Sequence, residues 1–113
     1  MKGIKKTISY DDFSKLDIRV GEVVSAENVK KSKKLLKLEI NFGDLGSRQI
    51  LSGISEWYLL EDLLGKKCVF IVNLQSRKMM GLESQGMVLM SEENSKPIFI
   101  IPEKNIKNGE PVI

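Results

Sequence analysis

The sequence contains no histidine and only one cysteine, and both facts limit the chemistry that the chain can perform. Histidine is the commonest general base and the commonest metal ligand, so a histidine-dependent nucleophilic triad and a His/Cys zinc site are both excluded. The chain also lacks a glycine-rich phosphate loop and a paired-acid motif. The residues therefore predict a protein that has no catalytic residues, binds no metal and uses no cofactor.

Long hydrophobic runs are also missing. No apolar run is long enough to cross a bilayer and no signal-peptide pattern opens the chain, so we expect a cytoplasmic location and no membrane partner. The single cysteine, Cys68, cannot form an intramolecular disulfide, which fits a reducing cytosol. With 42% hydrophobic and 29% charged residues, the composition predicts one globular domain over residues 1–113.

The net charge of +3 is small, but the basic residues are clustered. Five lysines fall within eight residues, and Arg77 with Lys78 forms a second basic point. Clustered cations are the electrostatic footprint of a polyanion partner, although a solvated loop kept soluble by lysine explains the run equally well. The clustered lysines are Lys30, Lys31, Lys33, Lys34 and Lys37.

Hydrophobic alternation predicts a chain made mainly of strands. In the first, over residues 17–27, Gly21 breaks the alternation, which is typical of a bulge or a sharp bend. Residues 36–42 alternate cleanly, and after a turn at 43–47 residues 48–52 close a hairpin with them. The remaining strands are predicted over residues 67–74, 86–91 and 97–101.

Two short helices are predicted between these strands and before them. Ser9 and Asp12 have the spacing of a capping box for a helix over residues 10–15, which is too short to be stable unless it docks on another surface. Ser55 is expected to cap a second helix over residues 56–64.

Three strands, a helix and two further strands is the order of an OB-fold, a small Greek-key barrel. We therefore predict an all-β fold: a five-stranded OB-fold barrel with a helix between strands three and four. A short N-terminal helix and a C-terminal strand extension flank it. An SH3-like barrel does not normally place an amphipathic helix at that point. The fourth strand is apolar throughout, so we expect it to be buried on both faces and the polar loop after it to carry the binding surface.

Both connections that border the groove of such a barrel are basic. They are the connector at residues 28–34, between strands one and two, and the loop between strands four and five. Neither contains an aromatic residue. Recognition of a nucleic acid is therefore expected to depend on shape and phosphate rather than on stacking against Phe or Tyr.

Six segments carry motifs, of which the most specific is NLQSRKMMGLESQGMVLM at residues 73–90. The others are DFSKLDIRVGEVVSAE (12–27), LLKLEINFG (35–43), RQILSGI (48–54), LLGKK (63–67) and IIPEK (100–104). Together they resemble the tRNA-binding domain found at the C-terminus of many methionyl-tRNA synthetases. The same module occurs as a free-standing dimeric tRNA-binding protein, as a bacterial secretion chaperone and in endothelial monocyte-activating polypeptide. The resemblance covers essentially the whole chain.

The resemblance implies a tRNA-contacting surface around the exit of the fourth strand. Family members use the asparagine after this strand, the following basic pair and a Ser-x-Gly-Met turn. Many members also carry His-Pro-x-Ala-Asp before a lysine that precedes strand two; here a lysine-rich stretch replaces it. The implied tRNA-binding residues are Lys30, Lys31, Lys33, Lys34, Asn73, Arg77, Lys78, Ser84, Gly86 and Met87.

Several of these residues have a structural alternative. Asn73 is of a type that often ties down the backbone of a loop, and Ser84 and Gly86 suit a fixed turn. Met87 is suited to the core as well as to an adaptable contact at the mouth of a groove. The sequence leaves these alternatives open.

The resemblance further implies a non-catalytic module that binds tRNA. It would act as the β subunit or the C-terminal domain of a methionyl-tRNA synthetase and raise the tRNA affinity of the catalytic subunit. It also implies a homodimer formed by residues 4–16 and 98–113, the latter beginning with four apolar residues at one edge. The alternative is a free-standing dimeric chaperone that binds unfolded peptides for secretion, whose binding would survive high salt.

Overall fold

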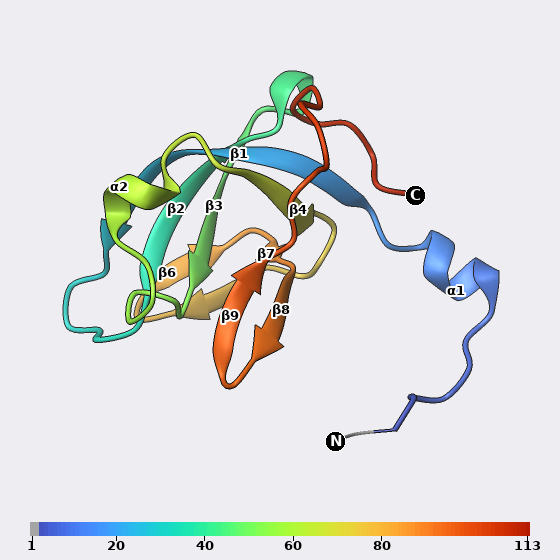
Figure 1. The fold of residues 1–113 in the computed structure, drawn as a ribbon, viewed down its shortest axis with the longest axis horizontal. Helices are drawn as coiled ribbons and strands as arrows, with labels where there is room; N and C mark the ends of the chain where they lie inside the picture. The colour runs from blue at the N-terminus through green and yellow to red at the C-terminus, as the bar shows by residue number, and fades with distance from the viewer. Residues whose placement is uncertain (1–2) are drawn as a thin grey trace.

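In the computed structural model, which describes residues 3–113, five antiparallel strands form a sheet that curls into a nearly closed barrel (Figure 1). The order of strands in the sheet is β3-β2-β1-β4-β7. This architecture confirms the predicted all-β, OB-like barrel. The strands are β1 (Ile18–Asn28), β2 (Leu36–Asn41), β3 (Ser47–Ser52), β4 (Lys67–Ile71) and β7 (Met87–Val88).

Two hairpins and three short helices complete the described part of the chain. No helix among residues 3–113 is long and apolar enough to cross a membrane. The helices are α1 (Tyr10–Ser14), the 3-10 helix η1 (Gly43–Leu45) and α2 (Leu60–Leu63), and the hairpins pair β5 (Arg77–Met79) with β6 (Leu82–Ser84) and β8 (Met90–Glu93) with β9 (Lys96–Phe99).

Strand β1 is long enough to serve two partners. Residues 18–22 pair with β4, and residues 22–28 pair with β2. A bulge at Val24, where the pairing with β2 shifts register, allows the strand to turn between them. The bend that the sequence predicted is therefore present, but its bulge lies three residues beyond Gly21. Gly21 instead lies where the backbone of β1 closely approaches the side chains of Ile40 and Phe42.

Alternate residues of β2 and the whole centre of β4 fill the barrel. The alternation predicted for residues 36–42 is confirmed, because its inward-facing side chains are fully buried. Residues 68–71 are all buried, as expected for a strand covered on both faces. The largest fully buried side chains are Phe42, Phe70, Leu36, Leu38, Ile40, Ile50 and Leu63.

The C-terminal tail covers the edge of β1 that β2 leaves free. The Gly109 N–H donates a hydrogen bond to the Val20 carbonyl at 2.7 Å, and the Val112 N–H donates to the Ile18 carbonyl at 2.8 Å. The tail thus continues the sheet beside the first half of β1, and this region of the barrel has no exposed strand edge.

Helix α1 forms where the sequence predicted it but does not dock on the barrel. The Ser9 hydroxyl caps it by accepting a hydrogen bond from the Asp12 N–H at 3.1 Å. No residue of α1 is buried, and the helix projects away from the barrel (Figure 1). Residues 3–8 form no helix or strand, and residues 1–2 lie outside the described residues.

Three predicted elements differ from the structure. The helix expected over residues 56–64 is confined to Leu60–Leu63, since the Ser55 hydroxyl donates to the Lys33 carbonyl instead of capping a helix. The strand expected over residues 86–91 is divided into β7 and β8. The loop expected after β4 contains the hairpin β5–β6, whose three-residue strands are too short to produce a visible alternation.

Replacing Gly21 with alanine is expected to destabilise the fold. An added Cβ would lie 2.5 Å from Cγ2 of Ile40 and 2.6 Å from Cε1 of Phe42, both fully or almost fully buried. Overpacking of this kind costs about 1–3 kcal/mol. The free energy of unfolding from urea denaturation would measure it.

Gly53→Ala is the matched control, because nothing lies within 4 Å of the added Cβ there. We expect it to change stability by less than about 0.5 kcal/mol. Equal destabilisation by the two substitutions would contradict the packing role of Gly21.

Candidate nucleic-acid interface

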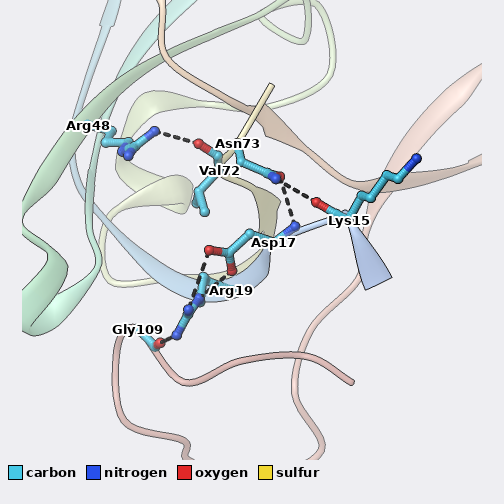
Figure 2. A network of polar contacts seen from close by, with 7 residues as sticks. All are labelled: Lys15, Asp17, Arg19, Arg48, Val72, Asn73 and Gly109. Atoms are coloured by element: carbon cyan, nitrogen blue, oxygen red, sulfur yellow. Dashed lines mark hydrogen bonds and ion pairs between the residues drawn. The ribbon is translucent and has the colours of Figure 1, made fainter. Parts of the chain in front are cut away.

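Asn73 joins the end of β4 to the segment that precedes β1 (Figure 2). Its side-chain oxygen accepts a hydrogen bond from the Asp17 N–H at 2.8 Å, and its amide group donates to the Lys15 carbonyl at 2.6 Å. Asn73 therefore holds the backbone, as its structural alternative predicted. Its side chain remains exposed, and a contact with tRNA stays a prediction.

Two arginines extend this network on either side (Figure 2). Arg48 donates to the Val72 carbonyl at 2.6 Å, and Arg19 donates to the Gly109 carbonyl at 3.1 Å. Arg19 also forms an ion pair with Asp17 at 2.5 Å, and this hydrogen-bonded contact raises the pKa of the Arg19 guanidinium. Both guanidinium groups are thus engaged within the chain.

Ser84 and Gly86 lie where the barrel closes. The Ser84 hydroxyl is buried, accepts a hydrogen bond from the Leu51 N–H at 3.0 Å and donates to the Gly86 carbonyl at 3.1 Å. Gly86 has φ of +145°, and an added Cβ would lie 2.8 Å from the Ile71 carbonyl oxygen. Glycine is required at this position by both conformation and space. The predicted Ser-x-Gly turn is therefore built into the wall of the barrel.

Gln85, between these two residues, completes the closure. Its N–H donates to the Gln49 carbonyl at 2.8 Å, and its side-chain oxygen accepts from the Gln49 N–H at 3.0 Å. The Gln49 side chain donates in turn to the Glu83 carbonyl at 2.9 Å. Residues 83–86, which we call the clasp, thereby supply hydrogen-bond partners for backbone groups on the free edge of β3.

The basic connector has a fixed backbone. The Val29 N–H donates to the Leu35 carbonyl at 3.1 Å, and Val29 is itself buried. The carbonyls of Lys33 and Lys34 accept from the Ser55 hydroxyl and the Ser55 N–H at 2.9 and 3.1 Å. The lysine side chains therefore project from a loop that is ordered by its own hydrogen bonds.

The predicted basic residues are exposed and free of internal partners. Among residues 3–113, none of them forms an ion pair with a carboxylate. They are therefore available to an external anion. The residues concerned are Lys30, Lys31, Lys33, Lys34, Arg77 and Lys78.

Two hollows are lined by five of the ten predicted residues. A groove of about 530 Å³ beside β3 and β7 is lined by four of them, Arg77, Ser84, Gly86 and Met87. A second cavity of about 350 Å³ is lined by one, Lys30. The other five predicted residues line neither hollow; they are Lys31, Lys33, Lys34, Asn73 and Lys78.

The sequence pattern missed part of the larger groove. Met79 and Met90 line it together with Met87, which opens β7 as expected but is 46% exposed and not a core residue. Methionine is flexible and polarizable, so a groove lined by three of them adapts to different contacts. The β5–β6 hairpin places Met79 in this groove. In the sequence, the turn of that hairpin is indicated only by the glycine of the Met80-Gly81 pair.

The exposed face of β1, β2 and β3 forms a further hollow, of about 420 Å³. This is the face on which OB-folds commonly bind oligonucleotides. Here Glu27 and Glu39 alternate with Lys37 and Arg48 along its lining. Because its charges are of both signs, this face is less suited to phosphate than the lysine connector and the β5–β6 hairpin.

The single cysteine of the chain lies in the core. Cys68 is fully buried, and burial raises the pKa of its thiol to about 12. Since the thiolate is the nucleophile, this cysteine is unreactive at neutral pH. Among residues 3–113, no three carboxylate or cysteine side chains lie close enough together to hold a metal ion.

A barrel with two neighbouring basic loops and an adaptable groove is the architecture of a nucleic-acid-binding module. Residues 18–111 match the family described as "Putative tRNA binding domain". The match covers most of the chain, and the chain belongs to this family of tRNA-binding domains.

The curated relatives include several methionine–tRNA ligases. The chain is 52% identical over 105 residues to the ligase of Archaeoglobus fulgidus, covering 93% of this chain and 16% of the relative. It is 48% identical over 111 residues to that of Clostridium acetobutylicum, covering 96% and 17%. The chain thus spans about one-sixth of the length of these relatives.

Solved structures support the same family. A MetRS-related protein from Pyrococcus horikoshii superposes with a TM-score of 0.89 at 37% identity and covers 96% of this chain and 100% of that one. The chaperone CsaA from Bacillus anthracis superposes with a TM-score of 0.86 at 31% identity and covers 96% and 100%. The solved structures that this chain resembles thus include a MetRS-related protein and a chaperone.

Ser84→Ala is expected to lower the stability of the fold and to leave the exposed surface almost unchanged, because Ser84 is buried. Loss of the hydroxyl leaves the buried Leu51 N–H without its acceptor, which costs about 1–3 kcal/mol. Thermal unfolding would show this as a lower Tm. The exposed Ser91→Ala is the control and should leave Tm nearly unchanged. An unchanged Tm together with lost tRNA binding would instead make Ser84 a contact residue.

Proposed function

We propose that this domain binds tRNA through the connector at residues 28–34 and the β5–β6 hairpin, mainly by contacts with phosphates. One observation carries the proposal: the two basic segments lie beside each other at one end of the barrel (Figure 1). There Lys30 of one segment lines the same cavity as Met80 and Leu82 of the other. Cations on two ordered loops, free of internal partners, match a folded polyanion in charge and rigidity.

Arg77, Lys78 and the lysines of the connector supply the affinity in this proposal. Asn73, Ser84 and Gly86 support it by holding the loop that presents them, since their polar groups or backbones are already engaged. Met87 contributes an adaptable apolar contact at the groove. The basic residues bind any phosphate backbone, so selectivity for tRNA comes from its shape.

The domain itself carries no reaction in this proposal. It acts in the cytoplasm as the C-terminal domain or the separate β subunit of a methionyl-tRNA synthetase, a context supported by the ligases that it resembles. A weak, sequence-tolerant site that is tethered to a catalytic subunit raises the local concentration of tRNA there.

Arg77→Ala/Lys78→Ala is expected to weaken tRNA binding several-fold at low salt. Each lost phosphate contact removes about one unit from the slope of log K against log salt, so the slope should fall by about two. Fluorescence anisotropy of labelled tRNA at a series of salt concentrations would measure both quantities.

The control for this experiment removes two lysines that lie outside the loop and outside both dimer segments, by Lys66→Ala/Lys96→Ala. It changes net charge equally and should affect the slope little. A wild-type protein that does not bind tRNA at low salt would refute the proposed function. An equal loss in both double variants would show that net charge, and not this loop, carries the affinity.

We propose further that the domain is a homodimer through residues 4–16 and 98–113. The five-residue helix α1 is too short to be stable alone and buries none of its residues on the barrel. Ile8 and Tyr10 are 60% and 79% exposed, and Ile101 in the tail is 60% exposed. Contact with a second copy of the chain would bury these apolar side chains.

Phe13→Asp and Ile101→Asp are each expected to convert the dimer to a monomer, because both place a charge in the apolar contact. Sedimentation velocity at micromolar concentrations would measure the change. Leu45→Asp, an exposed leucine of η1, is the control and should remain dimeric. A wild-type protein that sediments as a monomer would rule out the dimer.

A second candidate function is the binding of unfolded peptide in the groove beside β3 and β7. The three methionines that line it and the similarity to the chaperone CsaA favour this function. Apolar peptide binding would persist at high salt and would be lost in Met87→Asp but not in Arg77→Ala/Lys78→Ala. The same salt series, repeated with a labelled apolar peptide in place of tRNA, therefore separates the two functions.

A further inference from the structure

The cavity that Lys30 lines lies between the connector and the tip of the β5–β6 hairpin. It measures about 350 Å³, and Lys30 stands on one side with Met80 and Leu82 on the other. The buried Val29 contributes an apolar surface to its lining, and Asn28 contributes an amide. With Glu27 and Lys37, its lining thus combines three charged side chains, apolar groups and one amide.

The tip of the hairpin has an unexpected residue in a demanding conformation. Met79 pairs with Leu82, so that Met80 and Gly81 form a two-residue turn with φ of +53° and +79°. A turn with positive φ at both positions is of type I′, which prefers Asn or Gly at the first position because a larger side chain is strained there.

The chain contains a second turn of the same kind that follows this preference. Between β8 and β9, Asn94 and Ser95 have φ of +51° and +67°. The favoured Asn is therefore used at one hairpin tip and a methionine at the other. Local conformation does not explain Met80, whose side chain is 54% exposed and lines the cavity.

The charge of the cavity limits what it can hold. Lys37 forms an ion pair with Glu27 at 2.5 Å, and both residues line the cavity. These two charges cancel, which leaves Lys30 as the cation of the lining without an ion-pair partner among residues 3–113. This one cation matches a single phosphate, while the Val29, Met80 and Leu82 side chains of the lining match an uncharged planar group.

We propose that this cavity receives one unstacked nucleobase of a bound RNA, held by the Met80 and Leu82 side chains, with Lys30 contacting the adjacent phosphate. The proposal rests on the proposed function and adds to it the site at which a single-stranded part of the tRNA is engaged. Sulfur contacts aromatic rings favourably, and apolar side chains such as Met and Leu insert between bases in other complexes. The cavity thus replaces the aromatic platform that both loops lack.

The first measurement uses the methyl groups of methionine as reporters. The protein is labelled with ¹³C at the methionine methyls and titrated with a single-stranded hexaribonucleotide of mixed sequence and with a blunt RNA duplex of the same composition. We expect the single strand to shift the Met80 signal more than the Met87 and Met90 signals. The duplex, which has no unstacked base to insert, should leave Met80 nearly unchanged.

The second measurement is the tRNA affinity of Met80→Asn. Asn suits the left-handed conformation, so this variant is expected to have a Tm no lower than that of the wild type and about fivefold weaker tRNA binding, as for loss of one stacking contact. Leu45→Asn is the matched control: its side chain is 55% exposed, and η1 lies at the opposite end of the barrel (Figure 1). It should bind tRNA like the wild type.

The outcomes separate this inference from the proposed function. Normal tRNA binding by a stable Met80→Asn protein would refute the base-binding role of the cavity. A Met80 methyl signal that does not respond to the single strand would refute it as well. Neither result would contradict phosphate binding by the two loops. A Met80 shift with the single strand but no binding of tRNA would retain the cavity and refute the tRNA function. A Tm that falls in Met80→Asn would show that Met80 is needed for folding, which also contradicts the inference.

Discussion

The closure of the barrel between β3 and β7 is the constraint on which the rest of the structure depends. These outer strands of the sheet form no ladder with each other, and β7 contains only two residues. An open edge would leave backbone N–H and C=O groups of β3 unsatisfied. The clasp at residues 83–86 supplies the missing partners from one hydroxyl, one amide side chain and one backbone N–H. Because the clasp begins within β6, the closure that completes the core also fixes the hairpin that carries Arg77 and Lys78.

This arrangement assigns different tasks to residues that lie close together in one motif. In the segment from Asn73 to Met87, Asn73 and Ser84 are held by hydrogen bonds within the fold, and the exposed residues include two cations, Arg77 and Lys78, and two methionines, Met80 and Met87. Asn73 and Ser84 each use both their donor and acceptor capacity within the chain. Some residues of the motif therefore hold the fold together, and others form the exposed surface. Membership of the motif does not by itself make a residue a contact residue.

The sequence predicted most of the barrel because its strongest signals are local. The alternation from Leu36 to Phe42 and the apolar run in β4 are produced directly by burial on one face and on two faces. Predictions that depended on tertiary contacts were less accurate. The helix expected after Ser55 is short because the Ser55 side chain is used by the connector, a contact 22 residues away that no local pattern records.

The candidate site shows the same limit. Clustered cations are visible in a sequence, and the six basic residues are exposed as expected. The strain at Met80 was not visible, because it appears only when the register of β5 and β6 fixes the turn as two residues long. The role of Ser84 in closing the barrel was equally hidden, since its partner Leu51 lies 33 residues earlier in the chain.

The fixed backbone of the connector has a thermodynamic consequence for any partner. Hydrogen bonds from Val29 and Ser55 order this loop when the protein folds, so its backbone entropy is lost before a ligand arrives. Binding then restricts mainly lysine side chains and releases counterions from the polyanion, which makes the entropy of association favourable. With little apolar area to bury at these lysines, the heat capacity should change only slightly on binding. Association through this loop would therefore resemble the docking of two preformed surfaces, and its rate would be set by long-range electrostatic attraction rather than by a folding step.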